Sequence, residues 1–416
     1  MFKKTIILTA ADAISKVLGL LLTPLFLNFM PKEDFGEYSF IIVIVGGLPA
    51  FITLGLHISQ IKEFSSEIEV TIQRAVFSST LISVLVVSLL ILTIFSITGA
   101  SEYVMGHFFK IDTNKEMKWL LISLYSVSSC IGLILYSHTI ALKNTKILII
   151  FSLVKMILIN GISIYLLAIK FNEDSSLSRL LGSTIGDVFF NAIFFFFFCK
   201  KYFIFRVDKK YLLKALNLGL PMVPAAFAVL ISSSSDRYFI NKYFDFTYVA
   251  EYSLSVLCVS PLQMIMASAQ TILSPTVWAF KNDAEAFQHS TKFLFNFSLL
   301  LMPILLIIQA VIYFAKMYNI IPTTYEYINI ISLLLSFQTF TFILLQVPFN
   351  IFIKHSRTRL VAIISISIAI LSLLTGYFIT PLLGFTGLII SNTSINLFFL
   401  IACFFISKKI SFKNEM

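Results

Sequence analysis

The sequence comprises 416 residues, of which 58% are hydrophobic and only 12% are charged. A soluble domain carries about 25% charged residues, and a water-soluble fold of this size has no single core that covers so much apolar surface. The composition therefore excludes soluble, disordered, collagen-like and nucleic-acid-binding proteins and indicates an integral membrane protein. The formal net charge of +10 is interpreted by its position relative to the bilayer.

The predicted elements follow from the length needed to cross a bilayer. A transmembrane helix needs about 20 residues, and continuous apolar runs favour helices over β-barrel strands, whose apolar residues alternate. The sequence predicts an all-α polytopic membrane protein with about 12 transmembrane helices. In chain order they are Thr5–Met30, Tyr38–Ile61, Ala75–Ser101, Trp119–Leu142, Ile147–Ile169, Leu180–Cys199, Leu212–Tyr238, Tyr252–Phe280, Phe293–Ala315, Tyr327–Ile353, and two helices within Leu360–Ser407 that are separated by the turn signal Thr380-Pro381-Leu382-Leu383-Gly384.

The basic residues predict the orientation. Lys and Arg total 31, and more than half of them lie in loops on the face that carries both predicted termini. The positive-inside rule therefore places both termini in the cytoplasm. One cluster lies at the chain midpoint, which we interpret as a basic linker, with a specific anionic-lipid site as the alternative. The residues of this cluster are Lys200, Lys201, Arg206, Lys209, Lys210 and Lys214.

The two halves of the chain resemble each other weakly, in the same order. Phe35-Gly36-Glu37-Tyr38-Ser39 leads into the second predicted span, and Val249-Ala250-Glu251-Tyr252-Ser253 leads into the eighth. Because each half holds an even number of spans, the halves have one orientation and are related by a pseudo-two-fold axis along the membrane normal. The repeat predicts an N-terminal lobe at 1–200, a basic cytoplasmic linker at 201–214 and a C-terminal lobe at 215–416.

Repeats of this kind are typical of secondary transporters, in which the substrate site lies between the lobes near the midplane. Motifs distributed over nearly the whole chain also resemble one family. They are Lys16 and Pro24 before Phe35-Gly36-Glu37-Tyr38, then Gly219-Leu220-Pro221, Pro224, Ser235-Asp236-Arg237-Tyr238, Glu251-Tyr252-Ser253, Ser274-Pro275-Thr276 and Leu383-Gly384-Phe385-Thr386-Gly387. The chain resembles the polysaccharide transporter branch of the multidrug/oligosaccharidyl-lipid/polysaccharide exporter superfamily, and within it the bacterial O-antigen flippase (Wzx) type.

The resemblance implies a two-lobed, twelve-helix transporter of the bacterial inner membrane. Such a protein moves undecaprenyl-diphosphate-linked oligosaccharide from the cytoplasmic to the periplasmic leaflet by alternating access. Its expected partners are this lipid-linked oligosaccharide, membrane lipids and other polysaccharide-assembly proteins, with no nucleic acid among them.

Charged side chains inside predicted spans are the candidate site residues, because an ionisable group is costly to insert into a bilayer. Asp12 and Lys16 are four residues apart on one face of the first span. Either they form a structural ion pair, or Lys16 is a cavity charge for a diphosphate, with Asp12 as its partner or proton carrier. Lys155 either binds substrate or extends to the cytoplasmic surface. Asp187 either faces the cavity or pairs with another helix.

The seventh span carries a second group of candidates. Asp236 and Arg237 are adjacent, so on a helix they point about 100° apart and need not pair. Arg237 either presents its guanidinium to phosphate or sugar, or marks the outer interface, and Asp236 is a candidate for coupling or charge pairing. Gly219, Pro221 and Pro224 precede them and predict a bend, which makes them hinge candidates.

The sequence predicts no metal site, no catalytic residues and no cofactor, apart from a proton or sodium ion coupled to transport. Its four cysteines and five histidines lack the spacing of metal ligands. A drug or cation antiporter of the same superfamily is one alternative, against which Lys16 and Arg237 argue. A membrane-embedded polysaccharide polymerase is another, but the longest expected outer loop, Glu102–Lys118, has no paired carboxylates or metal ligands. A structural scaffold would leave the buried charges unexplained.

Overall fold

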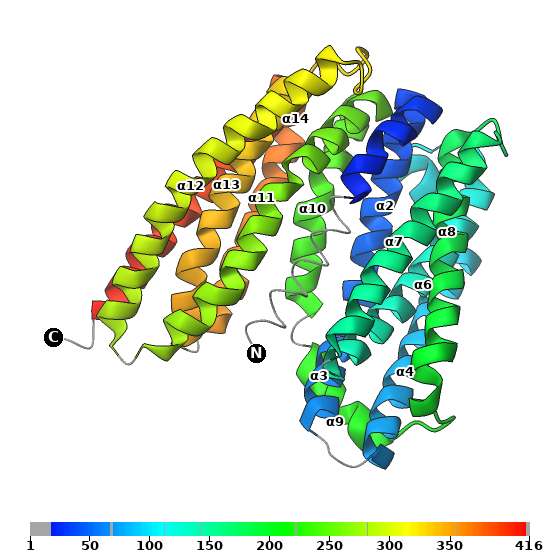
Figure 1. Cartoon of the computed structure of the whole chain (residues 1–416), viewed down its shortest axis with the longest axis horizontal. Helices are drawn as coiled ribbons and strands as arrows, with labels where there is room; N and C mark the ends of the chain where they lie inside the picture. The colour runs from blue at the N-terminus through cyan, green and yellow to red at the C-terminus, as the bar shows by residue number, and fades with distance from the viewer. Residues whose placement is uncertain are drawn as a thin grey trace. The chain divides into compact units, whose positions relative to one another are not determined.

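The computed structural model describes residues 18–66, 70–111, 113–142, 144–220, 223–280, 282–355 and 357–412 (Figure 1). Helices make up all the regular structure of these residues, which confirms the predicted all-α class. Contacts divide the chain into two compact units, Met1–Leu230 and Ile231–Met416. The boundary lies within helix α10 (Val223–Tyr243), and each unit is described by itself.

The first unit is a bundle of long helices connected by short helical segments. Helix α8 packs against both α6 and α7, and α6 also packs against α2, α3 and α4. After an apolar helix at Leu18–Phe29, the elements are α2 (Lys32–Ile52), α3 (Leu56–Ser66), α4 (Val70–Ile97), α5 (Ala100–Tyr103), the π-helix η1 (Val104–Phe108), α6 (Lys115–Ala141), α7 (Thr145–Ala168), α8 (Ser175–Phe194), the π-helix η2 (Phe195–Cys199), the 3-10 helix η3 (Lys200–Tyr202) and α9 (Lys209–Gly219).

A hydrophobic core joins the helices of the first unit. Phe77 of α4, Cys130 and Ile134 of α6, Phe151 of α7 and Phe194 of α8 are all buried in it. The rings of Phe151 and Phe194 meet edge-to-face with their centroids 4.8 Å apart, an arrangement that stabilises packing beyond the buried area alone. This core fixes the relative positions of α6, α7 and α8, which carry the charged residues discussed below.

Two regions of the first unit differ from their predictions. The expected single span Tyr38–Ile61 is wrong, because α2 ends at Ile52 and α3 begins at Leu56. At the break, Gly55 has a φ of +71°, which glycine adopts at little cost. The expected loop Glu102–Lys118 is also wrong in part, because α5, η1 and the first turn of α6 occupy it.

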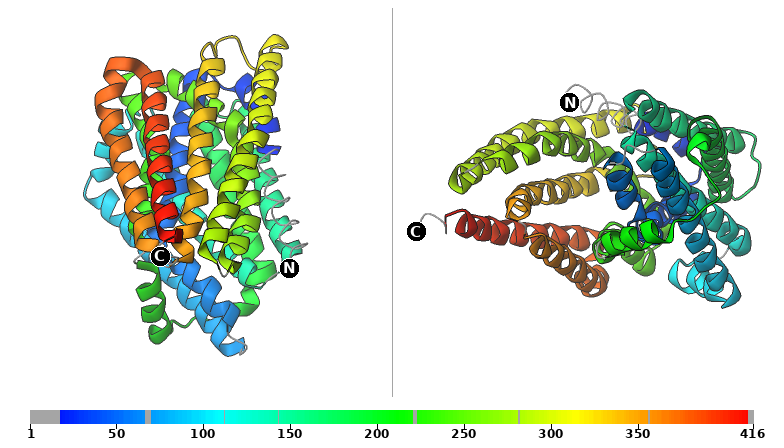
Figure 2. Two further views of the ribbon diagram at one scale, coloured as in Figure 1. Left: turned by 90° about the vertical axis from the view of Figure 1, so that its left-hand side faces the viewer. Right: turned by 90° about the horizontal axis from the view of Figure 1, so that it is seen from below.

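The second unit consists of long helices that run side by side (Figure 2). Helix α13 packs against α11, α12 and α14. Helices α11 and α12 begin where their sequences provide a cap, since Asp245 accepts the backbone N–H of Thr247 and Asn282 accepts that of Ala284. After α10, the elements are α11 (Phe246–Ala279), α12 (Asp283–Met317), α13 (Ile328–Lys354) and α14 (Thr358–Phe412).

The last element, α14, contains two helices. Gly384 inside it has non-helical angles, with φ at 70° and ψ at −169°. A positive φ of this size favours glycine, and Pro381 precedes it in the same turn. The predicted division of Leu360–Ser407 at Thr380–Gly384 is therefore confirmed.

The described helices identify a multi-pass membrane protein. Side chains such as Leu90, Phe197 and Leu382 are 56%, 79% and 79% exposed, as expected where helices face lipid rather than water. The total of about 12 spans stays a prediction. Among the described residues, six helices are long and apolar enough to cross a membrane: Val70–Ile97, Lys115–Ala141, Lys146–Ala168, Ser175–Tyr202, Ile328–Lys354 and Arg359–Phe412.

Candidate functional site

The predicted site residues separate into three sets. Asp12, Lys16 and Pro221 lie outside the described residues. Lys155 and Asp187 belong to the first unit, and Asp236 and Arg237 belong to the second. The hinge candidates Gly219 and Pro224 lie in the first unit, at the end of α9 and the start of α10.

Lys155 and Asp187 form an ion pair inside the first unit. Nζ of Lys155 on α7 lies 2.7 Å from Oδ1 of Asp187 on α8. The Asp187 side chain is 1% exposed, whereas that of Lys155 is 22% exposed. An isolated charge is costly at such depth, and the pair reduces this cost for both residues. Asp187 therefore has a partner on another helix, and Lys155 is oriented by that partner.

Neutral donors hold the other carboxylate oxygen of Asp187. Ser128 Oγ on α6 donates to Asp187 Oδ2 at 2.5 Å, and Asn191 Nδ2 on α8 donates to the same oxygen at 2.9 Å. Asn191 also donates to the backbone oxygen of Ser128 at 2.9 Å. Sequence reasoning missed Ser128 and Asn191, although the four-residue spacing of Asp187 and Asn191 was a signal that they share a helix face.

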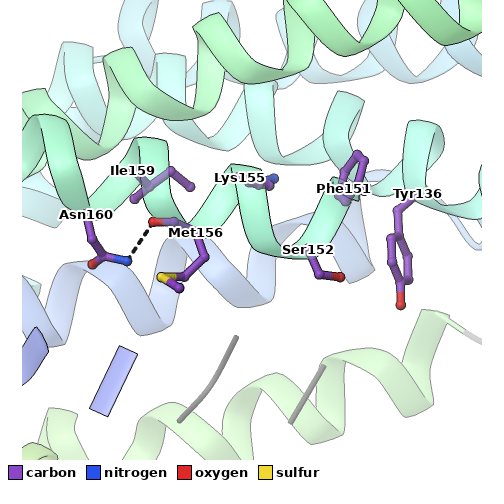
Figure 3. A pocket seen from close by; sticks show the side chains of 7 residues that line it. All are labelled: Tyr136, Phe151, Ser152, Lys155, Met156, Ile159 and Asn160. Carbon is purple, nitrogen blue, oxygen red and sulfur yellow. Dashed lines mark hydrogen bonds between the residues drawn. The ribbon is translucent and has the colours of Figure 1, made fainter. Parts of the chain in front are cut away.

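A pocket lies beside the Lys155–Asp187 pair and contains the side chain of Lys155 (Figure 3). Its volume is about 330 Å³, which is within the usual range for small-ligand sites. Asn160 at one end donates from Nδ2 to the backbone oxygen of Met156 at 2.9 Å. The lining combines one cation with hydroxyl, amide, aromatic and aliphatic groups: Tyr136 from α6, and Phe151, Ser152, Lys155, Met156, Ile159 and Asn160 from α7.

Asp236 is a buried carboxylate at which three helices of the second unit meet. The hydroxyl of Tyr252 on α11 donates to Asp236 Oδ2 at 2.5 Å. Asn392 Nδ2 on α14 donates to Asp236 Oδ1 at 2.7 Å. Asp236 itself is only 3% exposed. Both oxygens therefore have donors, which compensates in part for the loss of water around the carboxylate.

Arg237 contacts residues of the repeated motif. Its Nε donates to Ser253 Oγ at 3.0 Å, and its guanidinium carbon lies 5.4 Å from the centroid of the Tyr252 ring, within the range of a cation–π interaction. The motif residues Tyr252 and Ser253 thus hold the two adjacent charges of α10. Arg237 is 8% exposed, so it is buried among the residues around it.

The repeated motif of the first half, Phe35–Ser39, contacts a buried lysine through its glutamate. Lys118 Nζ on α6 forms an ion pair with Glu37 Oε1 on α2, and lies 2.8 Å from Asp174 Oδ2. Ser176 Oγ also donates to Glu37 Oε1 at 2.8 Å. The Lys118 side chain is 0% exposed. Sequence reasoning missed this residue because it directly precedes an apolar run and was assigned to a loop.

The repeated glutamates have equivalent structural roles in the two units. Glu37 lies in the second turn of α2 and joins it to the first turn of α6 through Lys118. Glu251 of α11 accepts the backbone N–H of Tyr327, the residue before α13, at 2.9 Å. Each glutamate therefore ties the start of its own helix to the start of another.

Asp174 lies in the connection before α8, outside the spans, and has three roles. It caps α8 by accepting the backbone N–H of Leu177 at 2.9 Å, it accepts from Asn114 Nδ2 at 3.1 Å, and it pairs with Lys118. Burial by itself raises the pKa of Asp174. The hydrogen bonds from Lys118 and Leu177 and the positive charge of Lys118 outweigh burial and lower this pKa from 3.8 to about 2.

Each motif tyrosine also lies beside an arginine. In the first unit, the Arg179 guanidinium carbon is 4.0 Å from the Tyr38 ring centroid and 3.7 Å from that of Phe26. The Tyr38 hydroxyl is hydrogen-bonded to Ser183 Oγ at 2.8 Å. In the second unit, Arg237 has the corresponding place beside Tyr252. Sequence reasoning missed Arg179, which precedes the predicted sixth span by one residue.

The hinge candidate Gly219 lies at a close backbone contact. A Cβ atom at Gly219 would be 2.4 Å from the backbone oxygen of Leu54. A Cβ at Gly55 would likewise be 2.6 Å from the Gly219 Cα. Glycine at both positions is required by this approach of α9 to the break between α2 and α3. Pro224 is exposed near the start of α10, and its role in bending the helix stays a prediction.

No group of three or more His, Cys, Asp or Glu is placed to hold a metal ion in the part of the chain that the structure describes. Cys130, Cys199 and Cys403 are free and buried. The candidate site chemistry therefore consists of ion pairs and hydrogen bonds in two places: the Lys155 pocket in the first unit and the Asp236 network in the second.

Comparison with known proteins identifies the fold and the family. The profile of the family described as "Polysaccharide biosynthesis protein" matches residues 1–281. No curated protein sequence matches the chain. Among solved structures, the lipid II flippase MurJ in its inward closed conformation is similar with a TM-score of 0.73 at 15% identity, covering 97% of this chain and 87% of that one.

Two further structures share the fold. An inward-facing transporter of the multidrug resistance MATE family, in the MOP superfamily, has a TM-score of 0.72 at 13% identity and covers 97% of this chain and 94% of its own. A MOP superfamily transporter from Pyrococcus furiosus has a TM-score of 0.52 at 15% identity, with coverages of 98% and 95%. The family match and the shared fold confirm the resemblance drawn from the sequence motifs, while the O-antigen type stays a prediction.

Proposed function

The chain belongs to the polysaccharide biosynthesis protein family, and on this premise we propose that it is a flippase for a lipid-linked oligosaccharide. The observation that carries the proposal is the family match over residues 1–281. The fold similarity to MurJ, a lipid II flippase, over 97% of this chain supports it. A polyprenyl tail remains in lipid while the polar head group passes through the protein by alternating access of two lobes.

The substrate that fits best is an undecaprenyl-diphosphate-linked repeat unit of O-antigen or a related polysaccharide. The Lys155 ammonium provides a point charge for a phosphate group. Ser152, Tyr136 and the Phe151 ring, in the same pocket, are groups that suit sugar hydroxyls and sugar faces. Transport runs from the cytoplasmic to the periplasmic leaflet of a bacterial inner membrane, with both termini in the cytoplasm.

The membrane potential favours this direction. Moving one negative charge outward across an inside-negative membrane is favourable by about 2.3 kcal/mol per 100 mV, so two charges gain roughly 4–5 kcal/mol. Coupling to a proton or sodium ion adds to this drive, and Asp12 and Asp236 are its candidates. Of the two, Asp236 is the one whose hydrogen-bond donors, Tyr252 and Asn392, are described.

A drug or cation antiporter is the main alternative, because MATE transporters have the same fold. Fold similarity does not separate the two functions, but the family match favours polysaccharide. A cationic side chain in the Lys155 pocket also suits an anionic substrate better than a cationic drug. A polymerase is less well supported, since α5, η1 and the first turn of α6 occupy much of Glu102–Lys118, which leaves little room for a catalytic loop there.

Complementation tests the proposal. The chain is expressed in a strain that lacks its flippase and makes the native glycan, and surface glycan is measured. We expect restoration by the wild type and loss of surface glycan with Lys155→Ala or Arg237→Ala at equal membrane abundance. Lys146→Ala, at an exposed position at the start of α7, is the control and keeps activity. Failure of the wild type with its native glycan contradicts the proposed function.

A further inference from the structure

Lys155 is the movable member of its ion pair. Its side chain is 22% exposed and lines the pocket, whereas Asp187 is 1% exposed. The lysine ammonium ends a flexible four-carbon stem. Asp187, in contrast, is fixed through Oδ2 by Ser128 and Asn191, which are donors on two different helices. The carboxylate therefore keeps two hydrogen bonds when the ammonium leaves.

Gly132 of α6 provides the space in which the ammonium meets Asp187. A Cβ atom at Gly132 would lie 2.8 Å from Lys155 Nζ, and 3.1 and 3.2 Å from Oδ1 and Nδ2 of Asn191. Asn191 is held by its bonds to Ser128. The end of the flexible lysine is therefore the group that would have to move. Any side chain at position 132 therefore requires the ammonium to shift from its place beside the carboxylate.

The Lys155–Asp187 pair is neutral as a unit, so it does not act on an anion as a free cation would. An anion in the pocket has to compete with Asp187 Oδ1 for one ammonium. We propose that Asp187 and Gly132 together set the anion affinity of the Lys155 pocket: the pair is the resting state, and a phosphate group of the substrate draws the ammonium from Asp187 into the pocket.

The proposal rests on the proposed function, because it names the substrate group that the flippase would bind here, a phosphate or diphosphate. It gives Asp187 a positioning role: this residue holds the ammonium back until the anion arrives, and it receives the ammonium again when the anion leaves. Reversible binding of this kind suits a transporter, which must release its substrate as well as bind it.

The test is pyrophosphate binding to the full chain in nanodiscs, measured by titration calorimetry. Asp187→Asn keeps the shape and removes the competing charge, so we expect pyrophosphate to bind about five- to tenfold more tightly than to the wild type. Gly132→Ala should shift affinity in the same direction without changing any charge. Gly161→Ala on α7, where a Cβ would meet no atom within 4 Å, is the control and leaves affinity unchanged. Lys155→Gln abolishes binding.

A second readout reports the ammonium directly. Labelling of Lys155 by a small amine-reactive reagent, quantified by mass spectrometry, should rise in Asp187→Asn and Gly132→Ala and fall when pyrophosphate is added. Equal or weaker pyrophosphate binding in both folded variants, or no binding to any of them, overturns the proposal. If transport of the lipid-linked oligosaccharide persists in that case, the proposed function stands and only this site assignment fails.

Discussion

Lys118 Nζ lies 2.8 Å from Asp174 Oδ2, although the Lys118 side chain is completely buried. The same ammonium pairs with Glu37, so one lysine joins α2, α6 and the cap of α8. A buried ammonium with two carboxylates is stable only while its partners remain, because each unpaired charge then carries its full desolvation cost. The stability of this end of the first unit therefore depends on the Lys118 side chain.

Replacing Lys118 is expected to be strongly destabilising. Lys118→Met keeps most of the side-chain volume but leaves Glu37 and Asp174 without their cation, which costs roughly 3–5 kcal/mol. Denaturant titration of the purified protein in micelles measures the loss. Lys146→Met, at an exposed lysine, is the matched control and should change stability by less than about 0.5 kcal/mol. Equal stability of the two variants would contradict the role assigned to the ion pairs.

Asp174 makes the stability of the first unit dependent on acid. Its pKa is about 2 in the folded chain and 3.8 ordinarily, so its contribution is complete above about pH 4 and is lost as the pH falls towards 2. The shift corresponds to roughly 2 kcal/mol. Asp174→Asn retains a capping side chain and should lower the melting temperature at pH 7, with the gap to wild type closing in acid. A gap that is constant over this pH range would contradict the assignment.

Tyr252→Phe isolates one hydrogen bond of the Asp236 network. The hydroxyl donates to the carboxylate at 2.5 Å, and a bond to a charged group contributes about 1.5–3 kcal/mol. We expect a loss of stability in that range, measured by unfolding in micelles, with the ring packing intact. Tyr313→Phe, at a ring that is 61% exposed, is the control. A loss no larger than that of Tyr313→Phe would contradict the role assigned to this hydrogen bond.

Gly219→Ala tests the contact of α9 with the break after α2. The new Cβ would meet the backbone oxygen of Leu54 at 2.4 Å, and backbone atoms cannot move aside as cheaply as a side-chain end. A loss of about 1–3 kcal/mol is expected. Gly46→Ala, in α2 with no atom within 4 Å of its Cβ, should be neutral or stabilising by up to about 1 kcal/mol. Matching melting temperatures for the two variants would argue against the close approach.

The sequence predicted the class and much of the organisation, because these depend on local properties. Apolar run length predicted the six described helices that are long and apolar enough to cross a membrane, and the glycine and proline at Gly384 and Pro381 located the division of the last run. The repeated motif pointed to Glu37 and Glu251, which the structure places in matching roles. All of these signals are contained in a few neighbouring residues.

The partners of the charged residues could not be predicted, because they come from helices far apart in sequence. Nothing near Asp187 indicates that its carboxylate meets Lys155 and Ser128. The sequence places Lys118 at the end of the expected loop Glu102–Lys118, and only tertiary packing buries it between two acidic residues. The break at Gly55 was missed because it lies within one continuous uncharged run, Tyr38–Ile61.

The most direct measurement of the central claim is flipping by the purified chain in proteoliposomes. Undecaprenyl-diphosphate-linked oligosaccharide is incorporated in both leaflets, and an external enzyme that cleaves the glycan reports how much becomes accessible with time. The account predicts that wild type exposes nearly all of the substrate, that Lys146→Ala does the same, and that Lys155→Ala leaves the inner-leaflet fraction protected. Protection of that fraction by wild type, as in protein-free liposomes, would contradict it.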